Sequence, residues 1–268
     1  MSILVVIPAR GPSTRLPMKP LRMIAGRSLL HRTIDLARRS VAGDVRIVVA
    51  TDDARIAEHA GLAGIEAVMT DAAITSGSGR ALAAARATEA AEDAIVINLQ
   101  GDAPFQPVGA LPAVIAALRD GSADVATPVV RLDWPALDAL RLHKQRAPFS
   151  GTTCVRDTAG RALWFSKTIL PAMRDEASLR AATALSPVLR HVGLYGYRLP
   201  ALERYEAAAP TELERLEGLE QLRLLDLHLT IDAVEVAPAG FDISGIDTEA
   251  DIVRAEALIA QHGDPFGT

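Results

Sequence analysis

The chain has 268 residues, a net charge of −5 and 49% apolar residues, which is enough to build a large α/β domain with a substantial core. The negative charge argues against a broad surface for nucleic acid or for an anionic membrane, since either would need clustered positive charge. The single cysteine, Cys154, excludes an internal disulfide. Without a secretory leader or an apolar run near ~18 residues, the sequence predicts a cytoplasmic protein.

In the first half of the chain, apolar runs typical of buried strands alternate with segments of helical periodicity. We expect strands at 3–7, 45–50, 66–69, 94–99 and 123–130, and helices at 28–40, 53–64, 79–92 and 108–121. This βαβα order predicts an α/β fold with a mostly parallel twisted sheet and helices on both faces.

The pattern changes after about residue 130. We expect two strands within 152–166 joined by a turn near Gly160, strands at 191–199 and 232–237, and helices at 211–227 and 248–262. Thr211 with Glu214, and Thr248 with Asp251, have the spacing of a capping box at the starts of these two helices. We therefore predict one domain over residues 1–268, in which about 131–200 forms a smaller inserted, β-rich subregion.

A cationic loop follows the first strand, at the edge of a parallel sheet where ligands bind. The stretch PARGPSTRLPMKP carries Arg10, Arg15 and Lys19. Arginine offers forked contacts and lysine a point charge, a combination suited to a triphosphate. The loop matches neither the Walker motif nor the glycine fingerprint of dinucleotide-binding proteins. The residues alone leave a solvated basic loop as an equal alternative.

Two aspartates also follow predicted strands. Asp102 lies in the stretch QGD after strand 94–99, where Gly101 permits close backbone approach, and Asp247 precedes the last helix. Carboxylate oxygens suit a hard cation such as Mg²⁺, and the two aspartates could share one ion. The alternatives are an ordinary turn residue at Asp102 and a helix-entry residue at Asp247 that complements the helix dipole.

The motifs taken together resemble the 3-deoxy-manno-octulosonate (Kdo) cytidylyltransferases, also called CMP-Kdo synthetases. The resemblance runs from residue 3 to about 256 through IPAR…STRLP.KPL, ATDD, TSG..R, QGD.P, HVGLYGYR, LE.LEQLRLL and DT..D. It implies a Rossmann-like, nucleotide-diphospho-sugar transferase-like fold. It also implies transfer of CMP from CTP to the anomeric hydroxyl of Kdo for lipopolysaccharide synthesis, with release of pyrophosphate, and a homodimer formed through the inserted region.

The resemblance also implies roles for individual residues. CTP would be bound by Ala9, Arg10, Ser13, Arg15, Lys19, Ser76, Gly77, Arg80 and Gln100. The cofactor Mg²⁺ would be bound by Asp102 and Asp247. The sugar acid would be bound by Gln100, Lys167, His191, Tyr195, Glu220 and Gln221. The catalytic residues would be Lys19, Arg15 and Asp102, because the reaction needs alignment and charge stabilisation more than covalent help.

Without the resemblance, the pocket residues have ordinary explanations. His191 would be a satisfied core or surface residue, Tyr195 a sheet-packing residue and Glu220 a solvated helix charge.

The sequence departs from the family pattern at several positions. Gly11 replaces an aromatic residue, Gly79 an acidic residue, Ala103 a glutamate, Thr153 a lysine and Lys167 an arginine. Because these changes lie near the base-recognition segment and the sugar pocket, two alternatives remain open. One is a CMP-activating enzyme for another keto-sugar acid, such as amino-Kdo or a sialic or nonulosonic acid. The other is a non-catalytic relative that binds nucleotide or sugar acid.

Overall fold

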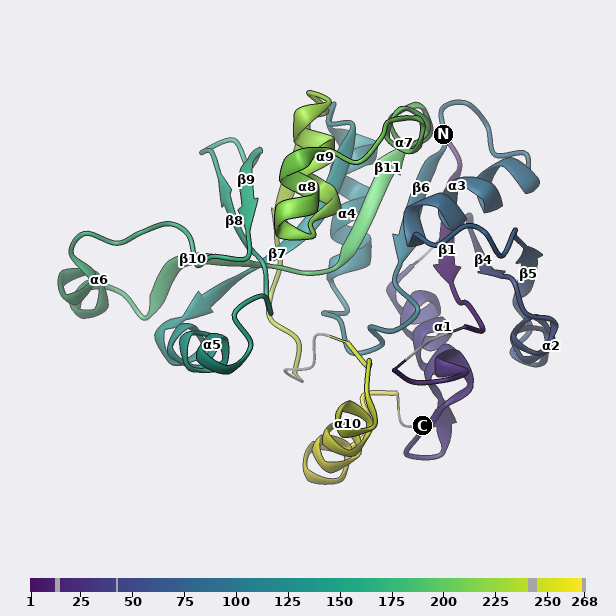
Figure 1. The fold of residues 1–268 in the computed structure, drawn as a ribbon, viewed down its shortest axis with the longest axis horizontal. Coiled ribbons are helices and arrows are strands. Elements are labelled where there is room, and N and C mark those ends of the chain that lie inside the picture. Colours follow the sequence, from purple (N-terminus) through teal and green to yellow (C-terminus); the bar gives the residue numbers. More distant parts are fainter. Residues whose placement is uncertain (13–14, 42, 241–244, 267–268) are drawn as a thin grey trace.

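The structure is a computed structural model that describes residues 1–12, 15–41, 43–240 and 245–266. Ser13, one of the predicted nucleotide-binding residues, lies outside these residues. A ten-stranded sheet crosses the molecule in the order β5-β4-β1-β6-β11-β7-β10-β8-β9, with β12 paired to β7 (Figure 1). A separate two-stranded sheet is formed by β2 and β3.

The strands are β1 (Ile3–Pro8), β2 (Met23–Ile24), β3 (Arg27–Ser28), β4 (Val45–Thr51), β5 (Glu66–Met69), β6 (Ile95–Leu99), β7 (Val125–Asp133), β8 (Thr153–Arg156), β9 (Ala162–Ser166), β10 (Leu185–His191), β11 (Leu194–Arg198) and β12 (Ile231–Glu235). The helices are the 3₁₀ turn η1 (Lys19–Leu21), α1 (Leu29–Ser40), α2 (Ala54–Leu62), α3 (Gly77–Ala87), α4 (Ala110–Asp120), α5 (Trp134–Arg146), α6 (Glu176–Ala182), α7 (Leu199–Ala207), α8 (Glu212–Glu217), α9 (Glu220–Asp226) and α10 (Glu249–His262).

The predicted α/β class is confirmed, and the sheet is mixed. Strands β5, β4, β1 and β6 form the parallel run expected from the first half of the chain. Strand β11 lies between β6 and β7 and is antiparallel to both, whereas β12 is parallel to β7. The carboxyl ends of β1 and β6 therefore point to the same edge of the sheet, and the loops that follow them lie side by side.

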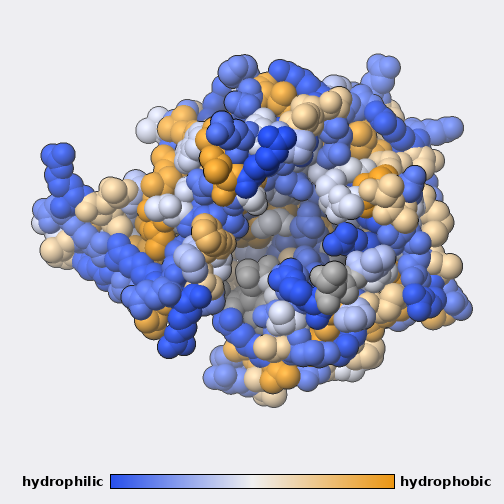
Figure 2. All heavy atoms as spheres, viewed as in Figure 1, coloured by the Kyte–Doolittle hydropathy of each residue, from blue (hydrophilic) through white to orange (hydrophobic). Residues whose placement is uncertain are grey.

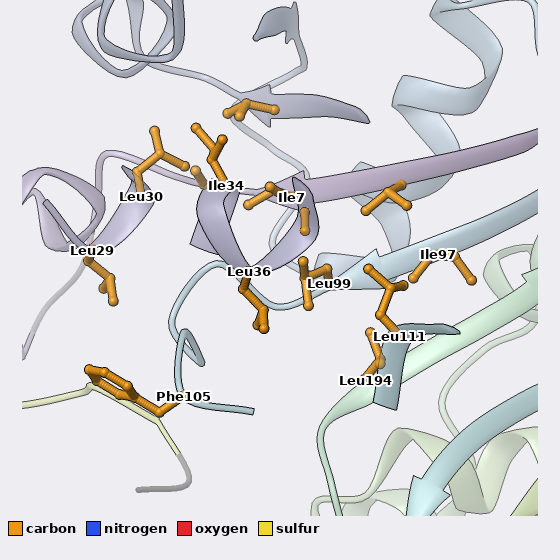
Figure 3. Packing of buried hydrophobic residues seen from close by; sticks show 14 of the residues in the cluster. Ile7, Leu29, Leu30, Ile34, Leu36, Ile97, Leu99, Phe105, Leu111 and Leu194 are labelled. Atoms are coloured by element: carbon orange, nitrogen blue, oxygen red, sulfur yellow. The ribbon is translucent and has the colours of Figure 1, made fainter. Parts of the chain in front are cut away.

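Helices cover both faces of the sheet. Because strand residues alternate between faces, Val5 and Ile7 of β1 pack into one core and Leu4 and Val6 into the other. The first core takes its helical side chains from α1, α2, α4 and α10, and the second from α3, α7 and α9. Figure 3 shows the first core, in which side chains of α1 gather against β1 and β6: Leu29, Leu30, Ile34, Leu36, Ile7, Ile97 and Leu99.

Two predicted elements are interrupted in the structure. The helix expected over 211–227 is two helices, because Gly218 adopts the left-handed conformation (φ 61°) and ends α8. The predicted capping box of Thr211 with Glu214 is present at the start of α8, and that of Thr248 with Asp251 at the start of α10. The strand expected over 191–199 begins at Leu194, because residues up to His191 belong to β10.

The region after residue 130 contains helices that periodicity did not predict. Asp133 caps α5 by accepting a hydrogen bond from the backbone N–H of Ala136, with proline in the first turn. Strands β8, β9 and β10 belong to the same sheet as β1 and lie with α5 and α6 on the side away from β4 and β5 (Figure 1). The division of the chain into a domain and an inserted subregion stays a prediction. Within the described ranges, no helix has the length and apolar character needed to cross a membrane.

Candidate active site

A cleft of about 270 Å³ opens where β1 and β6 end. Figure 2 shows that the surface on this face is hollowed near its centre, with hydrophilic residues around the hollow. Every described residue that was predicted to bind nucleotide or metal lines this one cleft: Ala9, Arg10, Arg15, Lys19, Ser76, Gly77, Arg80, Gln100, Asp102 and Asp247. The structure thus brings together groups from four distant parts of the sequence, while their roles stay predictions.

Lys19 lies between the two predicted metal ligands. Its Nζ donates to Asp102 Oδ2 at 2.8 Å and to Asp247 Oδ1 at 2.9 Å. Burial opposes the charged form of Lys19, but the neighbouring carboxylates outweigh it and raise the pKa of the ammonium. Arg15 adds a second cation, with a nitrogen 3.2 Å from Asp247 Oδ1. The cationic loop and both aspartates therefore converge on one point.

Backbone contacts hold this convergence in place. The N–H of Ile246 donates to the carbonyl of Asp102 at 2.8 Å, which brings the segment before α10 to the loop after β6. The N–H of Asp247 donates to the carboxylate of Asp251, which also forms the capping box of α10. Gly101 is required here, because a Cβ at this position would lie 2.4 Å from the carbonyl oxygen of Pro8.

The donor set at this point fits a hard divalent cation. Asp102 and Asp247 both present carboxylate oxygens within reach of the same ammonium nitrogen, and both side chains are partly exposed. Across the residues that the structure describes, no group of three or more His, Cys, Asp or Glu side chains could hold a metal by itself. Two carboxylates completed by water and substrate phosphates are a usual environment for Mg²⁺.

Arg80 is fixed at the other side of the cleft by Asp52, which the sequence motif ATDD contained but to which no role was assigned. The guanidinium of Arg80 donates to Asp52 Oδ2 and to Thr70 Oγ1, each at 2.6 Å. The second oxygen of Asp52 accepts from the backbone N–H of Gly11 at 3.0 Å. Both charged side chains are nearly inaccessible, at 2% and 4% exposed. Asp52 therefore joins the loop after β1 to helix α3.

Two of the departures from the family pattern have a steric reason. A Cβ on Gly79 would lie 2.7 Å from Ser76 Oγ and 3.1 Å from Glu206 Oε2, so that a carboxylate from α7 already occupies the space beside this position. A Cβ on Gly11 would lie 2.7 Å from Asp53 Oδ2. Glycine at position 79 thus lets the first turn of α3 pack against Glu206, and glycine at position 11 lets the loop after β1 pack against Asp53.

Three of the predicted sugar-acid residues form a connected cluster on β10, β11 and α9. Tyr195 donates its hydroxyl hydrogen to Gln221 Oε1 at 2.9 Å, and both side chains are buried. His191 contacts Tyr195, with ring centroids 5.3 Å apart, and its Nε2 is 2.8 Å from Thr127 Oγ1. Burial, helped by the charge of Lys167, lowers the pKa of His191 to about 3. His191 is therefore neutral near pH 7.

Lys167 and Glu220 flank this cluster. The Nζ of Lys167 donates to Thr152 Oγ1 at 3.2 Å, and burial lowers the pKa of its ammonium although Glu217 opposes the shift. Glu220 accepts from Ser78 Oγ at 3.4 Å, and burial followed by the charge of Glu206 raises the pKa of its carboxyl.

Of the six predicted sugar-acid residues, only Gln100 is among the described residues that line the cleft. The other five do not line the cleft. One of them, Glu220, contacts the first turn of α3 by accepting a hydrogen bond from Ser78. Because packed core residues make similar contacts, a role of these five in binding stays a prediction.

Comparisons with known proteins find relatives over nearly the whole chain. The family model described as cytidylyltransferase matches residues 4–231. The 3-deoxy-manno-octulosonate cytidylyltransferase of Maricaulis maris is 42% identical over 98% of this chain and 99% of its own length. The enzymes of the same name from Xylella fastidiosa and Aeromonas hydrophila are 41% and 38% identical, each over 97% of this chain.

A solved structure supports the same relationship. The structure of CMP:2-keto-3-deoxy-manno-octonic acid synthetase in complex with CTP superposes with a TM-score of 0.81 at 34% identity, and covers 97% of this chain and 99% of the other. This chain belongs to the cytidylyltransferase family and, within it, to the 3-deoxy-manno-octulosonate cytidylyltransferases.

Proposed function

We propose that this protein transfers CMP from CTP to the anomeric hydroxyl of Kdo and releases pyrophosphate. The observation that carries the proposal is the position of Lys19 between Asp102 and Asp247, in a cationic cleft at the carboxyl ends of β1 and β6. The near full-length similarity to enzymes named for this reaction supports it.

The residues of the cleft suit an attack on the α-phosphorus of CTP. Arg10, Arg15 and Lys19 bind the triphosphate and stabilise the negative charge that develops on the departing pyrophosphate. Arg80 and the first turn of α3 position the nucleoside, and Gln100 lies where the nucleotide and the acceptor meet. The cleft thus aligns the attacking hydroxyl with the leaving group, which is the main requirement of this reaction.

Asp102 and Asp247 would hold the divalent cation, for which Mg²⁺ is our proposal. When bound, the cation would neutralise phosphate charge and lower the pKa of the attacking hydroxyl. In the present structure Lys19 pairs with both carboxylates, and Arg15 supplies a second positive charge beside Asp247.

A keto-sugar acid other than Kdo is the second candidate acceptor. The observation behind it is Lys167, which presents a single ammonium where the resemblance leads to the planar fork of an arginine. An ammonium tolerates more than one position of a carboxylate or hydroxyl group, so an amino-substituted Kdo or a nonulosonic acid is a reasonable alternative.

The experiment measures pyrophosphate release with CTP, Mg²⁺ and a panel of keto-sugar acids, with Asp102→Asn as the inactive control. We expect turnover with Kdo or one close analogue, and a loss of at least about 100-fold in the control. Equal turnover of Kdo and a sialic acid would argue against a pocket shaped for Kdo. No turnover with any acid, but tight binding of CTP, would support a non-catalytic relative.

We also propose that the protein is a homodimer. Strand β9 ends the strand order of the sheet, and Leu163 on it is 56% exposed. Leu185 on β10 and Phe149 in the loop between α5 and β8 are also exposed, at 48% and 74%. Exposed apolar side chains beside a free strand edge favour pairing across a two-fold axis. Light scattering of the purified protein measures the mass directly.

A further inference from the structure

Lys144, one of three lysines in the chain, binds a set of backbone carbonyls next to the predicted sugar-acid pocket. From the last turn of α5, its Nζ donates to the carbonyls of Gly151 at 2.9 Å and Lys167 at 2.5 Å. It also donates to the carbonyl of Ser150, and more weakly to that of Pro148 at 3.3 Å. One ammonium therefore joins α5, the loop before β8 and the residue that follows β9.

The carbonyls that Lys144 binds belong to the segments that carry pocket groups. Gly151 precedes Thr152, whose carbonyl accepts from the backbone N–H of His191 at 2.9 Å. The hydroxyl of Thr152 accepts from Lys167 Nζ at 3.2 Å. Lys144 thus fixes the backbone on both sides of the contact between Thr152 and Lys167, and that backbone in turn fixes His191.

Partial burial of the Lys144 ammonium costs free energy. We take this cost as a sign that the geometry of the segment matters for function. Burial lowers the pKa of Lys144, and the charge of Lys167 lowers it further. Within the described part of the chain, Lys144 has no carboxylate at salt-bridge distance. The carbonyl dipoles are therefore the nearest groups that stabilise its charge, and the charge of Glu217 adds a smaller favourable effect. A partly buried ammonium is suited to this task, because its three N–H donors can point to separate carbonyls.

We propose that Lys144 is a positioning residue of the acceptor pocket, which sets Thr152 and Lys167 as one unit for the carboxylate and hydroxyl groups of the sugar acid. The proposal rests on the proposed function. It adds Lys144 and Thr152 to the residues that determine how the acceptor binds, and Lys144 does so without touching the acceptor.

The test compares Lys144→Met, Lys144→Arg and Thr152→Val with a matched control. Arg146→Met removes a charge from the same helix at an exposed position. We expect Lys144→Met to raise the KM for the sugar acid about tenfold, with kcat and the KM for CTP within about twofold of the wild type. Lys144→Arg should recover most of the loss because it keeps several donors. Thr152→Val should raise the same KM while leaving the contacts of Lys144 in place.

Hydrogen exchange tests the role of Lys144 without a measurement of turnover. In Lys144→Met, the amides of residues 150–154 and 167–170 should exchange faster than in Arg146→Met, while those of β1 and β6 stay unchanged. If the wild type turns over no sugar acid, the proposed function fails, whereas unchanged exchange in these segments overturns the role of Lys144. Equal kinetics of Lys144→Met and Arg146→Met, or a parallel rise of both KM values, also overturns it.

Discussion

Asp52 and Arg80 form a buried ion pair at one side of the cleft, with 2.6 Å between Oδ2 and the guanidinium nitrogen. The pair joins the end of β4 to α3, and the other oxygen of Asp52 holds the backbone N–H of Gly11. A single carboxylate therefore sets the distance between the loop after β1 and helix α3, which by our proposal bind the phosphates and the nucleoside.

Replacing Asp52 by asparagine should weaken CTP binding. The variant keeps the size of the side chain but leaves the charge of Arg80 without its buried partner, a change that usually costs about 3–5 kcal/mol of stability. We expect the dissociation constant for CTP, measured by calorimetry, to rise about tenfold or more. The matched control is Asp133→Asn, because Asp133 caps α5 at an exposed position away from the cleft and asparagine caps equally well. Equal CTP affinity of the two variants would contradict the role of Asp52.

Replacing Lys19 by methionine should affect catalysis more than folding. The variant would lack the ammonium that lies between Asp102 and Asp247 and that, by our proposal, binds the triphosphate. Groups that stabilise developing charge contribute about 100- to 1,000-fold to kcat, and we expect a loss in this range in the pyrophosphate assay. A variant with full kcat would show that the loop does not act on the leaving group.

Replacing Gly101 by alanine should destabilise the protein. The new Cβ would lie 2.4 Å from the carbonyl oxygen of Pro8, so the ends of β1 and β6 would have to separate. We expect a loss of about 1–3 kcal/mol in the free energy of unfolding, measured with urea. Gly109→Ala is the control, since a Cβ there meets nothing within 4 Å and Gly109 has a φ of −74°. Similar stabilities of the two variants would show that the strand ends are not tightly packed.

The neutral state of His191 should make the protein sensitive to acid. Its pKa of about 3 in the folded state lies below the value near 6.5 in the unfolded chain. Between these values the unfolded state binds more protons, so stability is present above pH 6.5 and falls by about 1.4 kcal/mol for each pH unit below it. His59, whose pKa is lowered by burial and by His31, contributes with the same sign.

The measurement is thermal unfolding between pH 7.5 and 5. We expect His191→Asn to be less stable than the wild type at pH 7.5 but to lose less stability on acidification. The exposed His143 provides the control His143→Gln, which should follow the wild type. A wild-type curve that is flat over this range, or one that His191→Asn leaves unchanged, would be inconsistent with an imidazole that is neutral in the folded state.

The sequence by itself determined most of the secondary structure and the edge of the sheet at which the cleft lies. The run 3–7 predicted a buried strand, and the charges of its loop suit a polyphosphate, although the residues alone left a solvated basic loop as an equal alternative. The spacings of Thr211 with Glu214 and of Thr248 with Asp251 fixed two helix starts, because capping is a local interaction between residues three apart. The motifs also indicated the family, since their order runs through almost the whole chain.

Only the tertiary structure decided which residues act together. The contact of Lys19 with Asp247 joins residues 228 positions apart, and no local pattern specifies such a distance. Asp52 and Lys144 were missed for the same reason: a carboxylate after a strand and a lysine in a helix are common, and their functions depend on the partners that the fold brings to them. The steric requirement for glycine at positions 11 and 79 likewise arises from side chains of other elements. Local interactions along the chain determine the helices and strands, whereas long-range packing determines which side chains meet at the site.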